Sequence, residues 1–438
     1  MEETPFSETV STKLRRIAEL AEEDPDRSFL SLAHHIDVEV LEEAYRRTRK
    51  DGAPGIDGRT ARDYEEDLEG NLRSLLKRFK DGDYKAPPVR RVHIPKGDGR
   101  KTRPIGIPTI EDKILQRAVT MVLETVYESI FSNSSYGFRP GRSARQAVQD
   151  LWTTLMDMGG GWVIEADIES FFDTLDHHKL RAILDRRVRD GVLRRTINKW
   201  LKAGVLEGTQ RHYPDSGTPQ GGVISPILAN IYLHAVLDEW FEKDITPRLQ
   251  GRAHLIRYAD DFVVVFRDEK DARLVFDRLG QRFAEFGLKL HPDKTRLIHF
   301  RPPTGGPRRE PRSFDFLGFK HHWERSRRGA WVVKQTTARS RLTRTLRRIK
   351  EWCRRNRHLP LAEQHRHLTR QLQGHDAYFG IRGNYGALEA LRYGVAPIWR
   401  RWLDRRSHRG RMHWERFRRV LERYPLPRPR LHPVRALA

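Results

Sequence analysis

The sequence contains a single cysteine, Cys353, among 438 residues. One thiol excludes an internal disulfide and any zinc site built from several cysteines. Long apolar runs are also missing: the mean hydropathy is −0.72, and no stretch of about 18 residues is apolar enough to predict a membrane span. The chain opens without the basic and apolar regions of a secretory signal. We therefore expect an intracellular, cytoplasmic protein with no membrane partner.

Positive charge is concentrated in the last third of the chain. The sequence has 83 Lys and Arg against 59 Asp and Glu, but residues 301–438 hold 35 basic and 10 acidic residues. A basic block with interleaved aromatic side chains favours binding to a phosphate backbone. The alternative is a basic surface that is only solvated. The aromatic residues are Trp331, Trp352, Tyr378, Phe379, Tyr385, Tyr393, Trp399, Trp402, Trp414 and Phe417.

An acidic pair lies between two apolar runs that are typical of strands. Asp260 and Asp261 end the tetrapeptide Tyr-Ala-Asp-Asp, with Leu-Ile before it at 255–256 and Phe-Val-Val-Val-Phe after it at 262–266. β-branched and aromatic residues on both sides of a tight acidic turn predict a hairpin. Because acidic turns are common, the pair alone does not identify a metal site.

A further carboxylate, Asp167, follows the apolar segment 162–166. Two metal ions held between carboxylates from separate strands, about 3.5–4 Å apart, are what nucleotidyl transfer requires. Mg²⁺ suits such ligands because it prefers oxygen and keeps contacts to substrate phosphates.

With these residues the chain resembles the reverse transcriptases, specifically the bacterial group II intron reverse transcriptase/maturases. The resemblance implies an α/β (α+β) right-hand polymerase with fingers and palm plus a helical thumb/X (maturase) domain. It implies catalysis by Asp167, Asp260 and Asp261. Two Mg²⁺ ions, with Mn²⁺ as a possible substitute, would be bound by these aspartates and by the backbone carbonyl of Ile168.

Other motifs follow in the order of that family. Residues 103–108, Arg-Pro-Ile-Gly-Ile-Pro, resemble the fingers motif, in which Lys96 and Arg103 would hold triphosphate oxygens. Residues 135–143, Ser-Tyr-Gly-Phe-Arg-Pro-Gly-Arg-Ser, resemble a block in which Arg139 and Arg142 would follow the template.

Three more positions are implied for the incoming dNTP. Gln220 lies in the Pro-Gln-Gly box, and Lys294 lies in the later palm motif at 288–295. Phe172, five residues after Asp167, occupies the position where a ring would exclude a ribose 2′ hydroxyl. The nearby Asp173 and Asp176 are expected to be caps or ion-pair partners rather than metal ligands.

The expected organisation is a helical N-terminal extension at 1–55, fingers and palm at 56–310, a thumb/X domain at 311–400, and a basic nucleic-acid-binding segment at 401–438. The segment from Arg301 to Arg312 is the expected loop. In the thumb, an apolar stripe through Leu342, Leu346 and Ile349 predicts a helix. Three arginines lie off this stripe and are expected to bind nucleic acid: Arg344, Arg347 and Arg348.

The resemblance implies an RNA-directed DNA polymerase that binds its group II intron RNA, assists splicing and copies the RNA into cDNA during retrohoming. Its partners would be intron RNA, an RNA template with a DNA primer, target DNA and dNTPs. Nothing resembles the family's endonuclease domain, and location at the nucleoid is expected when the protein acts on DNA. The alternative is a domesticated enzyme in phage defence, CRISPR spacer acquisition or DNA repair. A splicing factor with an inactive polymerase fits poorly with the intact aspartates.

Overall fold

The computed structural model describes residues 8–96, 101–207, 210–212, 217, 221–303, 313–406 and 411–432. The chain forms two compact units that are interleaved along the sequence. The first unit comprises residues 1–143, 166–262 and 270–295, and the second comprises residues 144–165, 263–269 and 296–438. Among the described residues, no helix is both long and apolar enough to cross a membrane.

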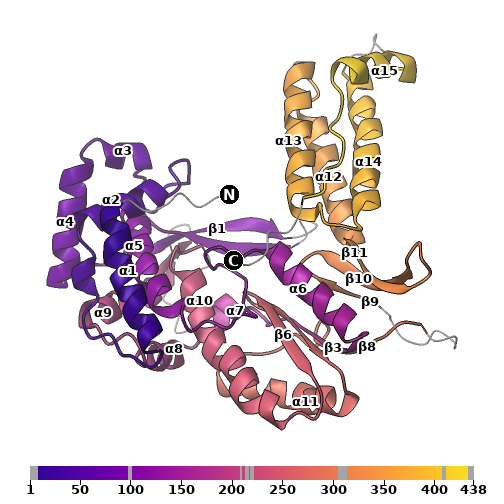
Figure 1. Cartoon of the computed structure of the whole chain (residues 1–438). Coiled ribbons are helices and arrows are strands. Elements are labelled where there is room, and N and C mark those ends of the chain that lie inside the picture. The colour runs from indigo at the N-terminus through magenta and orange to yellow at the C-terminus, as the bar shows by residue number, and fades with distance from the viewer. Residues whose placement is uncertain are drawn as a thin grey trace. The chain divides into compact units, whose positions relative to one another are not determined.

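The first unit is built mainly of helices around α5 (Ile110–Tyr127), which is buried on nearly every side and carries α1 and α2 against it (Figure 1). Thr109 caps α5 by accepting a hydrogen bond from the backbone of Asp112, and Asp37 caps α2 in the same way. The other helices are α1 (Glu8–Glu23), α2 (Val38–Arg47), α3 (Ala61–Glu65), α4 (Leu68–Asp81), α7 (Phe171–Thr174), α8 (His177–Leu184), α9 (Gly191–Leu201), α10 (Ser225–Leu233) and α11 (Glu269–Glu285), whose first residue belongs to the second unit.

Short non-α helices complete this unit. After α10 the chain continues through two π-helical segments, η2 (His234–Asp238) and η3 (Trp240–Ile245). The 3₁₀ helices are η1 (Ala33–His35) and η4 (Thr246–Arg248). π-helical turns are rare and frequently occur at functional sites.

One sheet of the first unit has the order β2-β1-β4-β5. Its long hairpin pairs β1 (Val89–Lys96) with β2 (Lys101–Ile107) in antiparallel register, from Arg90 opposite Ile107 to Lys96 opposite Lys101. The short strands β4 (Val205–Glu207) and β5 (Gln210–His212) extend the sheet, with β4 parallel to β1.

The central sheet has the order β6-β7-β3-β8, with β6 (Ala253–Tyr258), β7 (Asp261–Phe266), β3 (Gly161–Ala166) and β8 (Arg296–Phe300). β3 and β8 are antiparallel. Gly161 begins β3 at φ 158°, and a Cβ there would lie 2.1 Å from the carbonyl oxygen of Phe266. The start of β3 thus touches the end of β7. The two strands run in opposite directions, which brings the end of β3 to the start of β7.

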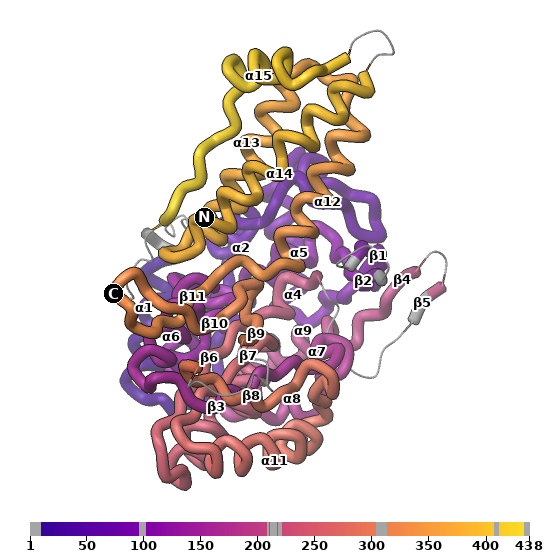
Figure 2. Tube along the Cα trace, turned by 90° about the vertical axis from the view of Figure 1, so that its right-hand side faces the viewer, coloured from indigo at the N-terminus to yellow at the C-terminus, as the bar shows by residue number. Residues whose placement is uncertain are grey.

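The second unit contains α6 (Ala144–Asp157), a three-stranded sheet and a helical bundle. The sheet has the order β11-β10-β9, formed by β9 (Ser313–Phe316), β10 (Phe319–Arg325) and β11 (Trp331–Thr337). The helices α12 (Arg339–Arg355), α13 (Leu361–Phe379) and α14 (Tyr385–Asp404) run side by side (Figure 2), and α15 (Trp414–Arg423) follows. Ile349, Trp399 and Phe417 are in the core of this bundle.

The helices of the bundle approach closely. A Cβ on Gly394 of α14 would lie 2.9 Å from the side chain of Leu346 on α12. Trp399 is fully buried and donates from Nε1 to Oε1 of Gln364 over 2.9 Å. The segment after α15 returns along the bundle, where the amide of His432 donates to the carbonyl of Gly380 over 2.7 Å.

Several expectations from the sequence are met. α1 and α2 occupy the predicted helical region. The predicted thumb helix is α12, in which Ile349 is buried while Leu342 and Leu346 pack against the same core. Within the predicted loop, residues 304–312 lie outside the described part. Residue 400, the predicted end of the thumb, lies within α14, and Leu403 of the same helix belongs to the bundle core. The domain boundaries all stay predictions.

Asp112 makes folding stability depend on pH. Burial raises the pKa of its carboxyl to about 7, and Oδ1 accepts from Tyr84 Oη and, over 3.2 Å, from Trp200 Nε1. The folded protein keeps the Asp112 carboxyl protonated up to about pH 7, whereas the unfolded chain releases this proton near pH 4. As the pH rises from about 4 to about 7, the contribution of Asp112 to the free energy of unfolding therefore decreases.

We expect Asp112→Asn to flatten this part of the pH profile, since an amide oxygen can accept the same hydrogen bonds without ionising. Melting temperatures between pH 5 and pH 8.5 test this, with the exposed Asp81→Asn as control. The variant should gain stability relative to the parent as the pH rises. An equal slope in the two proteins would contradict the assignment.

Candidate active site

The acidic pair predicted from the sequence lies at the turn between β6 and β7. Ala259 adopts the left-handed conformation with φ 56°, which is unfavourable for a residue with a side chain. Asp260 follows it and is half-buried, whereas Asp261 is exposed as the first residue of β7. The strained residue next to the acidic pair indicates that the surrounding structure fixes this turn.

Gly137 packs directly behind the turn. A Cβ at this position would lie 2.3 Å from the backbone nitrogen of Ala259, so only glycine allows the approach. Asn230 donates from Nδ2 to the carbonyl of Gly137 over 2.7 Å. In the same segment Ser135 forms a parallel β-bridge with Arg257. The block predicted to contact the template therefore also supports the acidic turn from behind.

A buried ion pair fixes the strand that leads into the turn. Arg257 is fully buried, and its Nε and Nη2 donate to the two carboxylate oxygens of Asp238 over 2.8 and 2.5 Å. Its Nη1 donates to Oδ1 of Asn230 over 3.1 Å and to the carbonyl of Ala259 over 3.2 Å. Burial alone would raise the pKa of Asp238, but the charge and hydrogen bonds of Arg257 outweigh it and lower the pKa to about 2.

Asp167 follows β3 at the same edge of the central sheet, because β3 ends where β7 begins. Its carbonyl accepts from the amide of His291 over 2.8 Å. Its Oδ2 lies 2.8 Å from Nζ of Lys294, and the two side chains are 31% and 52% exposed. Lys294 thus neutralises this carboxylate at an accessible position.

The donor set at this edge consists of aspartate oxygens, which suit a hard divalent cation. Lys294 contacts one of these oxygens and so provides positive charge beside Asp167. Among the described residues, however, no group of three or more His, Cys, Asp or Glu side chains is arranged to hold a metal ion. The ligand set of Asp167, Asp260, Asp261 and the Ile168 carbonyl accordingly stays a prediction.

Phe172 lies five residues beyond Asp167, in the short helix α7. It is half-buried, and its ring packs edge-on against Phe171 with centroids 5.3 Å apart. Gly217 lies against the backbone here, since a Cβ would be 2.7 Å from the carbonyl oxygen of Phe172. Asp176 caps α8 by accepting from the amides of His178 and Lys179, as the sequence predicted.

The fingers motif and the Pro-Gln-Gly box meet in the structure. Gly221 has φ 109°, and a Cβ there would lie 2.5 Å from the carbonyl of Gly106 on β2. Arg103 is exposed on that strand. The buried Gln116 accepts the amide of Val223 over 2.8 Å and so anchors the chain after the box. The side chain of Lys96 and all of Gln220 lie outside the described residues.

Arg139 has a different environment from the one we predicted. It is 7% exposed and donates to the Glu128 carboxylate and to the carbonyls of Ser132 and Ser135. These partners occupy its donors inside the protein, so a contact from Arg139 to the template is not supported. Arg142 is half-buried, and it donates to the backbone and side-chain carbonyls of Asn133.

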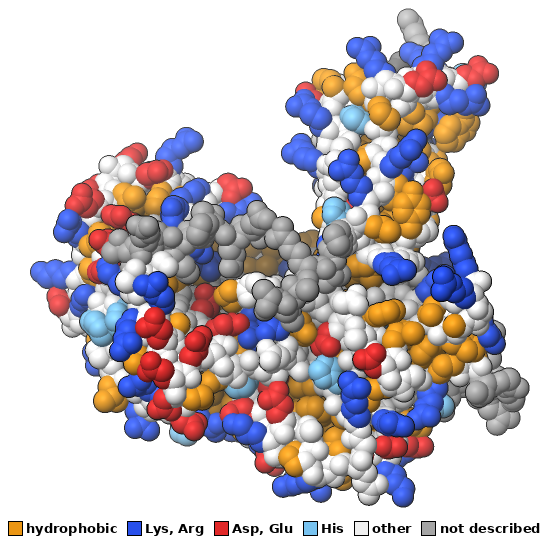
Figure 3. Space-filling model, viewed as in Figure 1, with side chains coloured by type: hydrophobic (Ala, Val, Ile, Leu, Met, Phe, Trp, Pro, Cys, Tyr) orange, Lys and Arg blue, Asp and Glu red, His pale blue; other side chains and the backbone are white. Residues whose placement is uncertain are grey.

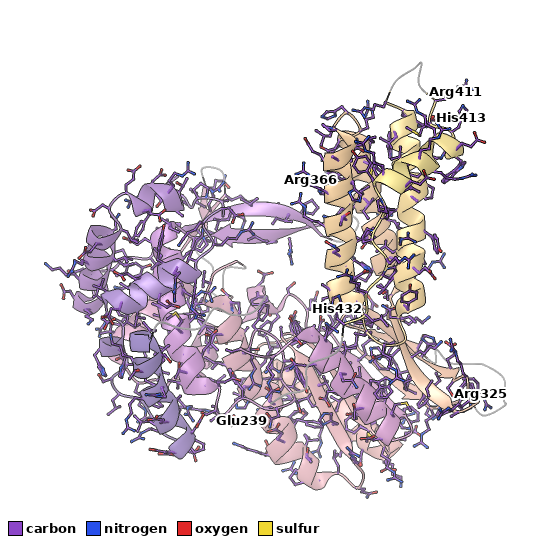
Figure 4. All side chains as sticks on the ribbon, turned by 45° about the horizontal axis from the view of Figure 1, so that its top comes forward. Glu239, Arg325, Arg366, Arg411, His413 and His432 are labelled. Carbon is purple, nitrogen blue, oxygen red and sulfur yellow. The ribbon has the colours of Figure 1, made fainter. Side chains whose placement is uncertain are left out.

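The three thumb arginines, Arg344, Arg347 and Arg348, are exposed on α12, away from the bundle core. Figure 3 shows basic side chains spread over the bundle with few acidic ones. In Figure 4, Arg366, Arg411 and His413 project outward from the bundle and from the segment before α15. The second unit therefore carries an exposed cationic surface.

Sequence reasoning missed Arg257, Asp238, Asn230, Gly137 and Gln116 as supports of the site. Their roles depend on contacts between distant segments. Two positions gave a signal that could have been used: Arg257 lies directly before the Tyr-Ala-Asp-Asp turn, and Gly137 lies within the block at 135–143.

Comparisons with known proteins agree with this geometry. A family model described as reverse transcriptase (RNA-dependent DNA polymerase) matches residues 94–321. Protein YkfC of Escherichia coli (strain K12) is 35% identical over 363 residues, which cover 75% of this chain and 92% of that protein. The group II intron-encoded protein LtrA of Lactococcus lactis subsp. cremoris is 39% identical over 226 residues, which cover 50% of this chain and 37% of LtrA. The chain thus spans just over a third of LtrA.

A double-mutant cycle tests the buried pair. We expect Arg257→Met and Asp238→Leu each to lower the free energy of unfolding by about 3–5 kcal/mol, because each leaves one buried charge unpaired. The double variant should lose much less than the sum. Denaturant unfolding measures these values, with the exposed Arg252→Met as the control. Additive losses would show that the pair is not a coupled unit.

Proposed function

The chain belongs to the reverse transcriptase (RNA-dependent DNA polymerase) family, and on this basis we propose that it is a group II intron enzyme that copies intron RNA into cDNA and assists splicing. The resemblance to the group II intron reverse transcriptase/maturases, seen in the sequence, is confirmed by the family match and by the similarity to LtrA. The maturase role, retrohoming and the intron RNA partner belong to the proposal, since only 37% of LtrA is covered.

One observation carries the proposal for the site. Asp167 and the Asp260–Asp261 pair lie at the same edge of the central sheet. Gly137 and Arg257 hold the turn that carries the pair. Carboxylates from separate strands at one edge are what two-metal nucleotidyl transfer requires. Preorganised charge contributes to catalysis because it needs little rearrangement during the reaction.

Family membership implies a polymerase that depends on divalent metal. We propose Mg²⁺, two ions with Mn²⁺ as a possible substitute, bound by Asp167, Asp260, Asp261 and the carbonyl of Ile168. The ions would activate the primer 3′ hydroxyl and stabilise the leaving pyrophosphate. Lys294, which is already bound to Asp167, would place its ammonium group where triphosphate oxygens arrive.

The remaining predicted residues complete the nucleotide site. Lys96 and Arg103 would bind the triphosphate from the β1–β2 hairpin, and Gln220 would contact the nucleotide near the base. Phe172 would exclude a 2′ hydroxyl, which makes dNTP the substrate. The close packing of Gly221 on Gly106 supports this arrangement, because it joins the glycine of the Pro-Gln-Gly box to the fingers strand.

Nucleic acid would be bound by both units. Arg142 is half-buried in the first unit, and Arg344, Arg347 and Arg348 form an exposed row on α12 in the second. We propose that these residues bind the RNA template with its DNA primer, intron RNA and target DNA. The basic excess of residues 301–438 supports this role.

Asp260→Ala tests the catalytic assignment. We expect it to lower primer extension on an RNA template by at least about a thousandfold, since a charge that stabilises the transition state is lost. Steady-state extension with dNTPs and Mg²⁺ measures the effect, with the exposed Asp268→Ala just after β7 as the matched control. Extension by Asp260→Ala at the parental rate would place the active site elsewhere.

The thumb arginines make a separate prediction. Replacing Arg344, Arg347 and Arg348 by Ala should weaken RNA binding and reduce the slope of log affinity against log salt by roughly one unit per lost phosphate contact. Filter binding over a range of salt concentrations gives this slope. The control removes three exposed arginines of the first unit, Arg15, Arg16 and Arg73. Equal slopes in the two triple variants would refute a specific role for α12.

A further inference from the structure

The hairpin of β10 and β11 in the second unit has a cationic tip that the nucleotide site does not use. The two strands pair along their whole length, and the outermost pair places Arg325 opposite Trp331. Among the described residues, the third strand, β9, pairs with β10 only as far as His322. The outer part of the hairpin is therefore a ribbon of two strands, and Figure 4 shows Arg325 at its outer end.

The turn that joins the two strands has a defined conformation. The amide of Gly329 donates to the carbonyl of Ser326 over 2.9 Å, and the amide of Ser326 donates to the carbonyl of Ala330 over 2.8 Å. Gly329 has φ 80°, a conformation that glycine adopts without strain. Arg327 and Arg328 are thus the two central residues of a β-turn, and both are exposed.

Arg325 adds a third cation to the tip, together with an aromatic ring. Its guanidinium lies 4.6 Å from the centroid of the Trp331 ring, and its Nη1 donates to the carbonyl of Gly329 over 2.6 Å. The arginine is nevertheless exposed, and the tryptophan is half-buried. The ring and the carbonyl orient the guanidinium before any ligand binds, which lowers the entropy cost of binding.

The positive charge of the tip is not neutralised by the hairpin itself. Glu324 is the one acidic residue between positions 319 and 337. Its carboxylate lies 2.6 Å from Nζ of Lys334 and 3.4 Å from Nε2 of His322. Lys334 therefore compensates this carboxylate. No ion pair with another described residue is found for the three tip arginines, Arg325, Arg327 and Arg328.

The shape of the tip distinguishes between nucleic acid duplexes. The major groove of B-form DNA is about 12 Å wide and admits a two-stranded β-ribbon. The major groove of an A-form RNA duplex is too deep and narrow for side chains to read. An arginine can bind phosphate oxygens, or the two acceptors of a guanine, with a pair of hydrogen bonds. A ribbon that ends in three arginines therefore suits B-form DNA.

We propose that the outer end of the β10–β11 hairpin binds the major groove of double-stranded DNA through Arg325, Arg327 and Arg328. The inference rests on the proposed function, in which target DNA is a partner, and it assigns this partner a surface separate from the arginine row of α12. The ring of Trp331 would hold the Arg325 guanidinium in place. The β-turn would present Arg327 and Arg328 to the groove.

Fluorescence anisotropy with a labelled DNA duplex tests the proposal on the full chain. The duplex is closed by loops at both ends, so it has no primer terminus for the polymerase site. Replacing the three tip arginines by Ala should weaken binding at least about tenfold and lower the slope of log affinity against log salt by roughly one unit per lost phosphate contact. The matched control replaces three exposed arginines of the first unit, Arg15, Arg16 and Arg73.

An RNA duplex of the same sequence, closed in the same way, tests the choice of DNA. We expect the triple variant and the parent to bind this RNA with similar affinity, because the A-form major groove does not admit the ribbon. An equal loss on RNA and on DNA would overturn the assignment to the B-form groove. Equal DNA affinity in the parent and the triple variant, or no DNA binding by the parent, would overturn the whole proposal.

A double variant, Arg327→Ala with Arg328→Ala, keeps the test decisive if the triple variant does not fold. It leaves Arg325 on the Trp331 ring and should lose a smaller part of the DNA affinity and of the salt slope. Parental DNA affinity in this variant would overturn a role for the turn. Primer extension by the parent on an RNA template tests the proposed function separately, so a failure of the hairpin to bind DNA is distinguishable from a failure of the polymerase assignment.

Discussion

The ion pair between Arg257 and Asp238 is the interaction on which the acidic turn between β6 and β7 depends. Two nitrogens of the planar Arg257 guanidinium donate to the two carboxylate oxygens of Asp238. This bidentate contact fixes the orientation of the two side chains as well as their distance, which a lysine could not do. Arg257 uses its remaining nitrogen on Asn230 and Ala259, so one side chain ties α10, η2 and the acidic turn together. The strain at Ala259 is tolerated because these contacts, with Gly137 behind the turn, leave the backbone no relaxed alternative.

Much of the architecture could be predicted from local patterns. The alternation of apolar runs and acidic turns located the β6–β7 hairpin, and the stripe through Leu342, Leu346 and Ile349 located α12. Both depend on residues close together in sequence, where the period of a strand or helix is visible. The family assignment followed from the order of the motifs, and the match to residues 94–321 confirms it.

The supporting contacts could not be predicted because they depend on burial. Arg139 and Arg142 lie in one loop and look alike in the sequence, yet Arg139 is buried among Glu128 and backbone carbonyls while Arg142 is only half-buried. Asp112 reads as an acidic residue in the first turn of a helix, and only the packing of Tyr84 and Trp200 shows why its pKa is raised. A sequence gives the chemistry of a side chain, whereas its surroundings decide whether it faces solvent or protein.

The contact between Lys294 and Asp167 gives the protein its own internal counter-ion. Any cation that binds the carboxylate must compete with a tethered ammonium that is always present at high local concentration. In the proposed function this competition would lower affinity for stray ions, and a nucleotide arriving with its metal would offer the displaced ammonium a new anionic partner. Under the proposed function, metal and nucleotide binding would then favour each other.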